Sequence, residues 1–523
     1  MLVLANPTKL RLNLSDQDIK KLIPVLTYKD KQVSFMLNRT RRGLQSLLQN
    51  SQFNISKMGS WKFDRKVEWT RSQIRELEKK EFRCLIEYDR EGPWVYSGLA
   101  DLVASTLGVA KPVAAYDLPE PDLIPWKNVP KHKSRYYQDE AVEALIKQVP
   151  YGPASIEMST GAGKSTILRS LTKHYSLKTL IMAPSTSIAT QLYEDLKYHL
   201  GDKYVGFFGG GKKKLGKLVT VAIDDSLVRV EPNSKEWEDL SKVQVFIVDE
   251  SHLIAATTQE KVATGLARNA PYRFFVTATL LRNDGKDLLL EGLVGKAVYT
   301  KPLKELVNEG YLSKPKFKMI DLDPEAPCHL ADANEITRQL LFYSDKVNAK
   351  VADIVKVFVD QKKPVIIRID EIEQFSKLYE HLKYYKIGFA HGPLNKDNRE
   401  FVPERFRDDI PNEVVDRFNQ GKLEILIGTS CIGTGTDIQV AEAGIYLVGG
   451  MSEIEVSQSV GRITRGGAKS HVYNPFTGDQ KTEAVWVDFR INHPVLSRHA
   501  NERKSIYDNL FGPTQVIDGE KSL

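Results

Sequence analysis

Residues 154–166 read Ala-Ser-Ile-Glu-Met-Ser-Thr-Gly-Ala-Gly-Lys-Ser-Thr, and this stretch decides the fold. Its first five residues predict a buried strand, and the run Ile167 to Tyr175 that follows predicts a helix. A glycine-rich turn between a strand and a helix lets backbone N–H groups point at an anion, because no Cβ atom stands in the way. The stretch therefore predicts a phosphate-binding loop, although the strict pattern wants a small residue where this chain has Met158.

Each side chain of the loop has an expected role. Lys164 would reach the β- and γ-phosphates of a bound nucleotide, and the Ser165 hydroxyl would bind magnesium. The alternative is a glycine-rich turn that binds nothing, so the rest of the chain has to decide. The other predicted nucleotide-binding residues of the loop are Thr160, Gly161, Ala162, Gly163 and Thr166.

The bulk composition limits the class of protein. A chain of 523 residues predicts about three domains. With 41% hydrophobic and 27% charged residues, wholesale disorder is excluded. Cys84, Cys328 and Cys431 lie far apart, which predicts a reducing compartment and neither disulfides nor a zinc site. The sequence has no apolar run of about 18 residues and no secretory leader pattern, so we expect a cytoplasmic protein.

The positive charge is concentrated near the start of the chain. The whole chain carries a formal charge of +7, yet residues 1–80 hold 17 Lys and Arg against 7 Asp and Glu. Such an excess favours a polyanion partner, because neutralising phosphates releases counterions. A basic face that is merely solvated is the alternative.

Three domains are expected, at 1–125, 126–310 and 311–523, and the first is a basic accessory unit. It ends in a proline-rich acidic linker at 117–122. Its aromatic and basic stretches at 61–66 and 68–71 could stack on bases, but we favour half-buried strands there. Helices are expected over 72–80 and 99–107.

The two later domains alternate strand-length apolar runs with amphipathic helical segments, which predicts parallel sheets wrapped by helices. A flexible basic loop is expected at 209–214, a helix at 304–311 should join the two domains, and a last helix is expected at 493–507. The expected strands are 155–158, 179–183, 218–223, 243–248 and 274–277 in the second domain, then 316–320, 365–369, 388–390, 424–427, 443–448 and 484–487 in the third.

The second strong signal is the stretch 245–252, Val-Phe-Ile-Val-Asp-Glu-Ser-His. Its two carboxylates emerge at the carboxyl end of a buried strand, where parallel sheets bind ligands. Asp249 would hold magnesium, and Glu250 would orient and deprotonate the attacking water. A surface turn is the alternative. Because the stretch lies some 85 residues after the phosphate loop, an ATP hydrolase is the leading interpretation.

The Asp-Glu-Ser-His at 249–252 resembles the second motif of superfamily 2 helicases and translocases, and the resemblance spans roughly residues 130 to 510. It implies an α/β fold of two tandem RecA-like parallel-sheet domains, preceded here by a small α+β N-terminal domain. Arg135-Tyr136-Tyr137-Gln138 resembles the adenine-recognising segment of that family. The Gln138 amide would bind the adenine edge, Arg135 would bind beside it, and Tyr137 would pack nearby.

Other stretches resemble the nucleic-acid and coupling motifs of the family. Asp224 and Asp225 stand where a Thr-x-x-Ser-like stretch is expected, and their charge would repel phosphates. The implied contacts to the nucleic-acid backbone are Pro184, Ser185 and Thr186 of motif Ia, His391 and Gly392 of motif IVa, and Thr429 and Ser430 of motif V. The implied coupling residues are His252, Thr277 and Thr279 of motif III, and Gln458 of motif VI.

Motif V continues to Gly435 and Asp437, which would contact the nucleotide, Asp437 through the ribose. Residues 458–465, Gln-Ser-Val-Gly-Arg-Ile-Thr-Arg, match motif VI. Arg462 and Arg465 lie three apart, hence on one predicted helical face, and would act as arginine fingers on the transferring phosphoryl group.

The resemblance implies a motor driven by ATP and Mg²⁺ that grips the backbone of DNA. The segment 304–312, the turn 283–285 and the N-terminal extension are similar to the XPB-like and phage UvsW-type group, which suggests a phage origin as one alternative. This group implies duplex or branched DNA, selected with the help of residues 1–125, and partners among replication or recombination proteins. An RNA helicase and a duplex-translocating motor of a restriction or remodelling complex are the open alternatives.

Overall fold

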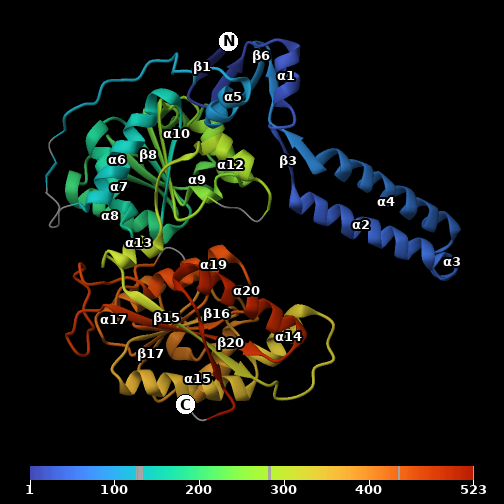
Figure 1. Ribbon diagram of the computed structural model, residues 1–523, viewed down its shortest axis with the longest axis vertical. Helices are drawn as coiled ribbons and strands as arrows, with labels where there is room; N and C mark the ends of the chain where they lie inside the picture. The colour runs from blue at the N-terminus through green and yellow to red at the C-terminus, as the bar shows by residue number, and fades with distance from the viewer. Residues whose placement is uncertain (125, 128–133, 281–283, 434–435, 522–523) are drawn as a thin grey trace. The chain divides into compact units, whose positions relative to one another are not determined.

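The computed structural model describes residues 1–523 except 125, 128–133, 281–283, 434–435 and 522–523 (Figure 1). Contacts divide the chain into two units. The first comprises Met1–Glu157 and Ser165–Thr300, and the second comprises Met158–Lys164 and Lys301–Leu523. The phosphate-loop segment 158–164 thus belongs by its contacts to the second unit.

An eight-stranded sheet forms the centre of the first unit. The pairs between β11 and β8, β8 and β12, β12 and β13, and β13 and β7 are all parallel, so their carboxyl ends share one edge. The strands are buried on both faces because helices cover both sides (Figure 1). The order is β10 (Lys212–Lys214), β9 (Val205–Gly209), β11 (Val219–Ile223), β8 (Thr179–Ala183), β12 (Val245–Asp249), β13 (Tyr272–Thr277), β7 (Ala154–Met158) and β14 (Ala297–Lys301).

Helices connect these strands as expected for a parallel sheet. Helix α7 begins directly after the phosphate loop and runs to Tyr175, where the sequence predicted it to end. The helices are α6 (Tyr136–Gln148), α7 (Lys164–Tyr175), α8 (Thr186–Leu200), α9 (Asp224–Leu227), α10 (Lys235–Leu240), α11 (Thr257–Lys261) and α12 (Asp287–Val294).

One prediction in this domain is wrong. Residues 209–214 were expected to be a flexible loop, but Lys212–Lys214 forms strand β10, antiparallel to β9. The glycines between them adopt positive φ angles, which makes a tight turn possible where a loop of ordinary residues would be longer. Strand β9 was not predicted, although its five residues are buried.

The small N-terminal domain is α+β, as predicted. A four-stranded antiparallel sheet packs with helices α1 (Asp16–Leu22) and α5 (Ala100–Leu107). Its core is continuous with that of the first parallel-sheet domain. At Gly98 an added Cβ atom would lie 2.2 Å from the carbonyl oxygen of Glu291 in α12, so the two backbones touch there. The sheet order is β1 (Leu2–Asn6), β2 (Lys9–Leu12), β6 (Gly92–Tyr96) and β5 (Glu87–Asp89).

A long helical hairpin projects from this domain (Figure 1). It consists of α2 (Lys31–Gln49), α3 (Ser51–Met58) and α4 (Ser60–Glu81), and it follows β3 (Thr27–Lys29), which pairs with β4 (Phe82–Cys84). The predicted strands at 61–66 and 68–71 are therefore wrong. The apolar positions there recur every three or four residues, which is a helical period and not the period of two that a strand needs.

The second unit is built on a seven-stranded sheet whose neighbouring strands are parallel. All six strands predicted in this domain are present, and β21 was missed. The order is β17 (Ile387–Ala390), β18 (Ile425–Gly428), β16 (Val365–Ile369), β19 (Ala443–Leu447), β20 (Glu483–Ile491), β15 (Lys314–Leu322) and β21 (Gln515–Asp518).

Two apolar clusters, one on each face of this sheet, are covered by helices. The joining helix lies at α13 (Leu303–Asn308), close to the prediction, and the last helix runs longer than predicted. The predicted fold class is confirmed. The helices are α13, α14 (Ala333–Thr337), α15 (Asp345–Asp360), α16 (Gln374–Leu382), α17 (Pro411–Asn419), α18 (Ser430–Gly433), α19 (Glu453–Ile463) and α20 (Pro494–Phe511).

Candidate functional site

The phosphate loop joins β7 to α7, and its conformation depends on glycine. Gly161 and Gly163 have φ angles of +85° and +84°, which only glycine adopts without a steric penalty. The Ala162 N–H donates to the carbonyl oxygen of Ser159 at 3.1 Å, which tightens the turn. Helix α7 has 12 residues and begins at Lys164, so its first N–H groups and the positive end of its dipole face the loop. This geometry suits a phosphate.

Met158 does not disturb this arrangement. It is the last residue of β7 and is fully buried in the sheet. The side chains of Thr160, Lys164, Ser165 and Thr166 are half-buried and remain accessible. Met158, which stands where the strict pattern has a small residue, therefore packs in the core at the end of the strand and leaves the turn unchanged.

The two carboxylates lie at the carboxyl edge of the same sheet. Asp249 ends β12 and is buried, and its Oδ1 accepts a hydrogen bond from the N–H of Glu250 at 3.0 Å. Glu250 adopts a left-handed conformation with φ 53° and ψ 50°. For a residue with a Cβ this conformation costs on the order of 1–3 kcal/mol, and such residues cluster at functional sites. The strained backbone at Glu250 therefore marks the carboxyl end of β12 as a candidate catalytic position.

Glu250, His252 and Thr277 form a connected chain of polar groups. His252 Nδ1 lies 2.9 Å from Thr277 Oγ1 and 3.5 Å from Glu250 Oε2. The Thr277 hydroxyl donates to the carbonyl oxygen of Thr279 at 2.9 Å. Because that hydroxyl has only one proton, His252 Nδ1 must be the donor to Thr277. Nδ1 therefore carries a proton, and because the same nitrogen lies 3.5 Å from Glu250 Oε2, Glu250 is in electrostatic contact with the hydrogen-bonded groups that lead to Thr279.

The segment that resembles an adenine site begins helix α6. Gln138 is buried, and its Oε1 accepts a hydrogen bond from the Arg135 N–H at 2.9 Å. Arg135 Nη1 donates to the Tyr137 hydroxyl at 2.7 Å. Tyr137 is fully buried and belongs to the core, so the aromatic ring on the surface is that of Tyr136, which is 47% exposed.

In the second unit, the two motif VI arginines meet motif V. Arg462 lies in α19, and its Nη1 donates to the carbonyl oxygen of Thr436 at 2.7 Å. Arg465 forms an ion pair with Asp437. Burial lowers the pKa of Arg465 to about 10, so the guanidinium still carries its charge at neutral pH. The segment 436–437 thus positions both cations.

The prediction that Arg462 and Arg465 share one helical face is wrong. Helix α19 ends at Ile463, and Arg465 lies beyond its C-cap, Thr464. The chain turns there through Gly466 and Gly467, which both have positive φ angles. The two guanidinium groups approach one segment because of this turn and not because of helical periodicity.

Family models match both parallel-sheet domains. The model described as "Type III restriction enzyme, res subunit" matches residues 131–282, and "Helicase conserved C-terminal domain" matches residues 347–467. The chain belongs to the superfamily 2 helicases and translocases. The predicted resemblance is confirmed, and the enzyme is an ATP-hydrolysing helicase of that superfamily.

Known relatives agree with this assignment. The DNA 3'-5' translocase XPB2 of Sulfurisphaera tokodaii is 26% identical over 374 residues, which cover 64% of this chain and 79% of the relative. The ATP-dependent DNA helicase uvsW of Enterobacteria phage T4 is 22% identical over 398 residues, covering 70% and 75%. The structure of the ATP-dependent Type ISP restriction-modification enzyme LlaBIII bound to DNA has a TM-score of 0.53 at 13% identity, covering 75% of this chain and 32% of that one. This last likeness concerns the fold alone.

The residues of this helicase that were predicted to touch nucleic acid lie at the carboxyl ends of strands. Pro184 and Ser185 follow β8, Thr186 begins α8, and the Ser185 hydroxyl caps that helix by accepting from the Ile188 N–H at 3.3 Å. Thr429 and Ser430 follow β18, and Thr429 is buried while Ser430 is exposed.

His391 of motif IVa lies in the interior of the helicase, where its ring contacts backbone carbonyl groups. Its ring is buried, with Nδ1 2.7 Å from the carbonyl oxygen of Gly392 and Nε2 2.9 Å from that of Phe406. A Cβ atom at Gly392 would meet nothing within 4 Å, so the backbone there is open. Gln458 is half-buried in α19. Gly435, together with the neighbouring Thr434, lies outside the described residues, as do residues 281–283.

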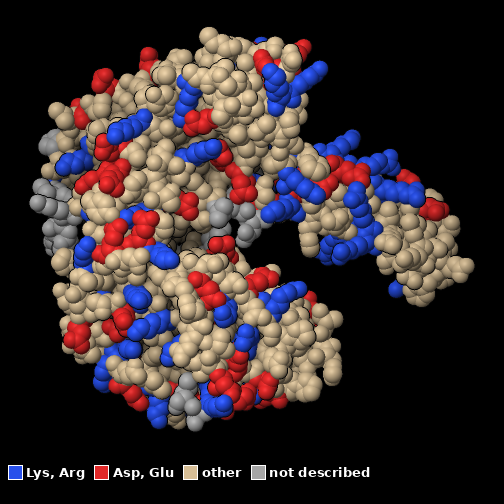
Figure 2. All heavy atoms as spheres, in the orientation of Figure 1, with Lys and Arg blue, Asp and Glu red and all other residues tan. Residues whose placement is uncertain are grey.

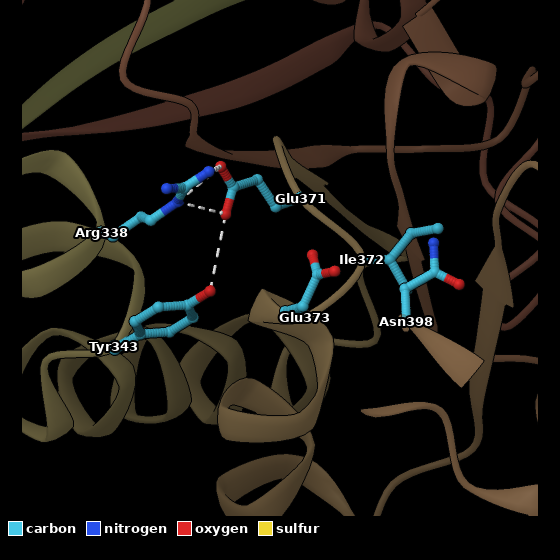
Figure 3. A pocket seen from close by; sticks show the side chains of 6 residues that line it. All are labelled: Arg338, Tyr343, Glu371, Ile372, Glu373 and Asn398. Atoms are coloured by element: carbon cyan, nitrogen blue, oxygen red, sulfur yellow. Dashed lines mark hydrogen bonds and ion pairs between the residues drawn. The ribbon is translucent and has the colours of Figure 1, made fainter. Parts of the chain in front are cut away.

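A hollow of about 520 Å³ lies beyond the carboxyl end of β16 and was not predicted (Figure 3). Arg338 donates from Nε to both carboxylate oxygens of Glu371 at 2.9 Å, and the Tyr343 hydroxyl donates to the same group at 3.5 Å. Burial, together with Glu371, raises the pKa of Tyr343. Glu373 adds a second carboxylate, so the rim is acidic and does not suit a phosphate backbone.

Among the helices of the described residues, no stretch is long and apolar enough to cross a lipid bilayer.

Proposed function

We propose that this helicase couples ATP hydrolysis to movement along duplex or branched DNA. The observation that carries the proposal is the chain from Glu250 through His252 and Thr277 to Thr279. It joins a carboxylate at the edge of the first sheet to the motif III residues. A change in the charge or position of Glu250 therefore has a physical route to Thr279.

The nucleotide would bind at the phosphate loop, with Lys164 on the phosphates and Gln138 and Arg135 beside the adenine. Glu250 would orient the attacking water and accept its proton, a role worth about 10² to 10⁴ in rate. The left-handed backbone at Glu250 supports this role, because strain of this kind is retained where function requires a fixed carboxylate.

Arg462 and Arg465 would stabilise the charge that develops on the transferring phosphoryl group. Their attachment to residues 436–437 supports this role, because both cations are held in place before any ligand arrives. Within the second unit, a Cβ atom on Gly161 would lie 3.6 Å from Cγ of Arg465. Asp437, which was expected to reach the ribose, would have to exchange Arg465 for the sugar hydroxyls.

The Ser165 hydroxyl and the Asp249 carboxylate would hold Mg²⁺. Both are hard oxygen donors, and Mg²⁺ in ATPases commonly takes one or two protein oxygens and leaves its other positions to water and phosphate. When bound, the ion would neutralise charge on the phosphates. The half-buried Ser165 and the buried Asp249 fit such a donor set.

DNA is favoured as the track because the relatives from Sulfurisphaera tokodaii and phage T4 are named as a DNA translocase and a DNA helicase. The excess of basic residues in the first 80 positions supports a polyanion. We infer that residues 1–125 select the substrate, that 126–310 bind ATP, and that 311–523 form the second motor domain. Replication or recombination proteins would be its partners.

A duplex-translocating motor of a restriction complex is the second candidate. The family description that matches residues 131–282 favours it. Strand separation distinguishes the two candidates.

The test measures ATP turnover with Mg²⁺ in the presence of forked DNA, four-way junctions, linear duplex and duplex RNA. We expect the largest stimulation by branched DNA, and loss of turnover by at least 100-fold in Glu250→Gln. Strand displacement from a fork would support the helicase. Stimulation by linear duplex without displacement would favour the restriction-type motor, and unchanged turnover in Glu250→Gln would refute the role of that residue.

A further inference from the structure

The helical hairpin α2–α4 carries a charge pattern that the motor function does not explain. Residues 31–81 contain 12 Lys and Arg against 5 Asp and Glu, an excess of +7. The whole chain also has a formal charge of +7, so the remainder of the protein is neutral in sum. Figure 2 shows Lys and Arg gathered along the projecting hairpin.

The hairpin is a two-stranded antiparallel coiled coil with a thin core. Its inward positions recur at spacings of four and three residues, the a and d positions of a heptad repeat. Of these, Leu37, Phe63 and Val67 are buried. The inward positions are 33, 37, 40, 44 and 47 of α2, and 63, 67, 70, 74, 77 and 81 of α4.

The heptad repeat separates the charged residues into two faces. In an antiparallel pair, the e positions of one helix lie against the e positions of the other, which agrees with the ion pair of 2.7 Å between Arg41 and Glu78. The e and b positions form a paired face, in which Arg71 and Arg75 lie 3.1 Å and 3.7 Å from Glu68. With Lys31 and Asp64, this face has four basic and three acidic residues.

The c, f and g positions form the basic face. Seven basic residues lie there against the single acidic Glu76, and all seven are exposed. Within the described part of the chain, none of the seven forms an ion pair. Trp69 lies on the same face and is 60% exposed. The seven are Arg39, Arg42, Lys62, Arg65, Lys66, Lys79 and Lys80.

The base of the hairpin is fixed to the first parallel-sheet domain just before helix α12. The Lys31 N–H donates to the carbonyl oxygen of Asp284 at 3.1 Å, and Lys286 lies 3.6 Å from Asp30. Gly285 has a φ angle of +78°, and a Cβ atom there would lie 2.6 Å from the carbonyl oxygen of Lys29. These contacts fix the base of the hairpin to residues 284–286 of the first parallel-sheet domain.

We propose that the basic face of the α2–α4 hairpin binds the phosphate backbone of duplex DNA and so holds the duplex on the first parallel-sheet domain, to which the base of the hairpin is fixed. The inference deepens the proposed function and rests on it. From Lys62 to Lys80 the face spans about 27 Å at 1.5 Å per residue, which is most of the roughly 34 Å helical turn of DNA. The exposed cations can therefore follow one groove, with Trp69 beside the backbone.

The test compares two triple variants of the full chain that remove equal charge. The first, Arg39→Gln with Lys62→Gln and Lys66→Gln, alters the basic face. The control, Arg41→Gln with Arg71→Gln and Arg75→Gln, alters the paired face. Glutamine keeps a good helix propensity, and none of the six positions lies in the inward seam. Far-ultraviolet circular dichroism confirms that both variants are folded.

Binding of forked DNA without nucleotide is followed by fluorescence anisotropy at several salt concentrations. We expect the basic-face variant to lose at least about tenfold in affinity at about 0.1 M salt. Its plot of log K against log salt should be less steep by about 2.7, which is 0.9 for each of three lost phosphate contacts. The control should stay within about twofold of the wild type.

The results separate this inference from the proposed function. Equal affinities in the basic-face variant and the wild type, or equal losses in both variants, would overturn the inference. If the basic-face variant alone loses affinity while no nucleic acid stimulates wild-type ATP turnover, the hairpin binds DNA and the motor proposal falls. Duplex RNA bound as tightly as duplex DNA, with the same dependence on the basic face, would overturn the choice of DNA.

Discussion

Lys481 offers a test of the electrostatics inside the second unit. Its side chain is 1% exposed, and its Nζ donates to the carbonyl oxygen of Gln439 at 2.9 Å. Burial lowers the pKa of Lys481 to about 7, a shift that Glu442 opposes and that Arg465 reinforces. The difference from a usual value near 10.5 corresponds to roughly 5 kcal/mol at 1.36 kcal/mol for each pH unit.

The sign of the pH dependence follows from proton counting. Between about pH 7 and pH 10.5 the unfolded chain holds a proton on Lys481 that the folded protein has released, so raising the pH stabilises the folded protein. Below about pH 7 Lys481 is protonated in both the folded and the unfolded protein, and the folded protein bears the full cost of burying the charged amine. From pH 7.5 to pH 9 the free energy of unfolding should rise by about 2 kcal/mol because of this group.

Lys481→Met keeps the length of the apolar stem of the side chain and removes the amine. At pH 7.5 the removal of the buried amine raises the free energy of unfolding by about 4 kcal/mol. The loss of the hydrogen bond to Gln439 lowers it by about 1 kcal/mol. It should therefore be more stable than the wild type by about 3 kcal/mol at pH 7.5, and by about 1 kcal/mol at pH 9.

The assay is urea unfolding of the wild type and the variant at both pH values, with the exposed Lys422 changed to Met as the control. The control should show the same pH dependence as the wild type. A difference between Lys481→Met and the wild type that stays constant from pH 7.5 to pH 9 would refute the reasoning, because it would mean that Lys481 keeps its proton in the folded protein.

Three further outcomes are expected. Asp488→Ala should lower the free energy of unfolding by about 3–5 kcal/mol in urea titrations. The Nε of Arg503 donates to Asp488 at 2.7 Å, so the variant leaves this guanidinium buried without its carboxylate partner. A loss below about 1 kcal/mol would contradict this reasoning. Thr277→Val should reduce DNA-stimulated kcat about tenfold, because the loss of one hydrogen bond of about 1.4 kcal/mol corresponds to that factor. An unchanged kcat would show that the polar groups from Glu250 to Thr279 do not contribute to DNA-stimulated turnover. Gly285→Ala should lower the Tm of the first unit by several degrees in calorimetry, because a Cβ atom costs about 1–2 kcal/mol at a positive φ. An unaltered Tm would contradict the close approach of residue 285 to the carbonyl oxygen of Lys29.

The sequence located most of the parallel strands. Runs such as 179–183 and 365–369 were predicted with their observed bounds, because a strand buried on both faces must be apolar throughout. The hairpin α2–α4 was missed at 61–71. The aromatic and basic residues there are compatible with strands, whereas the heptad spacing of Phe63, Val67 and Thr70 is a helical period.

The order of the motifs along the chain was enough to indicate a phosphate loop, two carboxylates and a pair of arginines, because each depends on a local sequence and the end of a strand. Phosphate loops need glycine, and carboxylates that follow an apolar run must emerge at the edge of a sheet. The sequence by itself therefore determined the class of enzyme and the chemistry of the residues that serve it.

Only the tertiary structure decided which partners those residues have. It set the hydrogen bond between His252 and Thr277, the meeting of Arg462 and Arg465 at residues 436–437, and the turn after α19 that makes this meeting possible. Residues distant in sequence are brought together by packing and strand order, which no local pattern records. The same packing turned Met158 into a core residue at the end of β7, which is why the phosphate loop tolerates it.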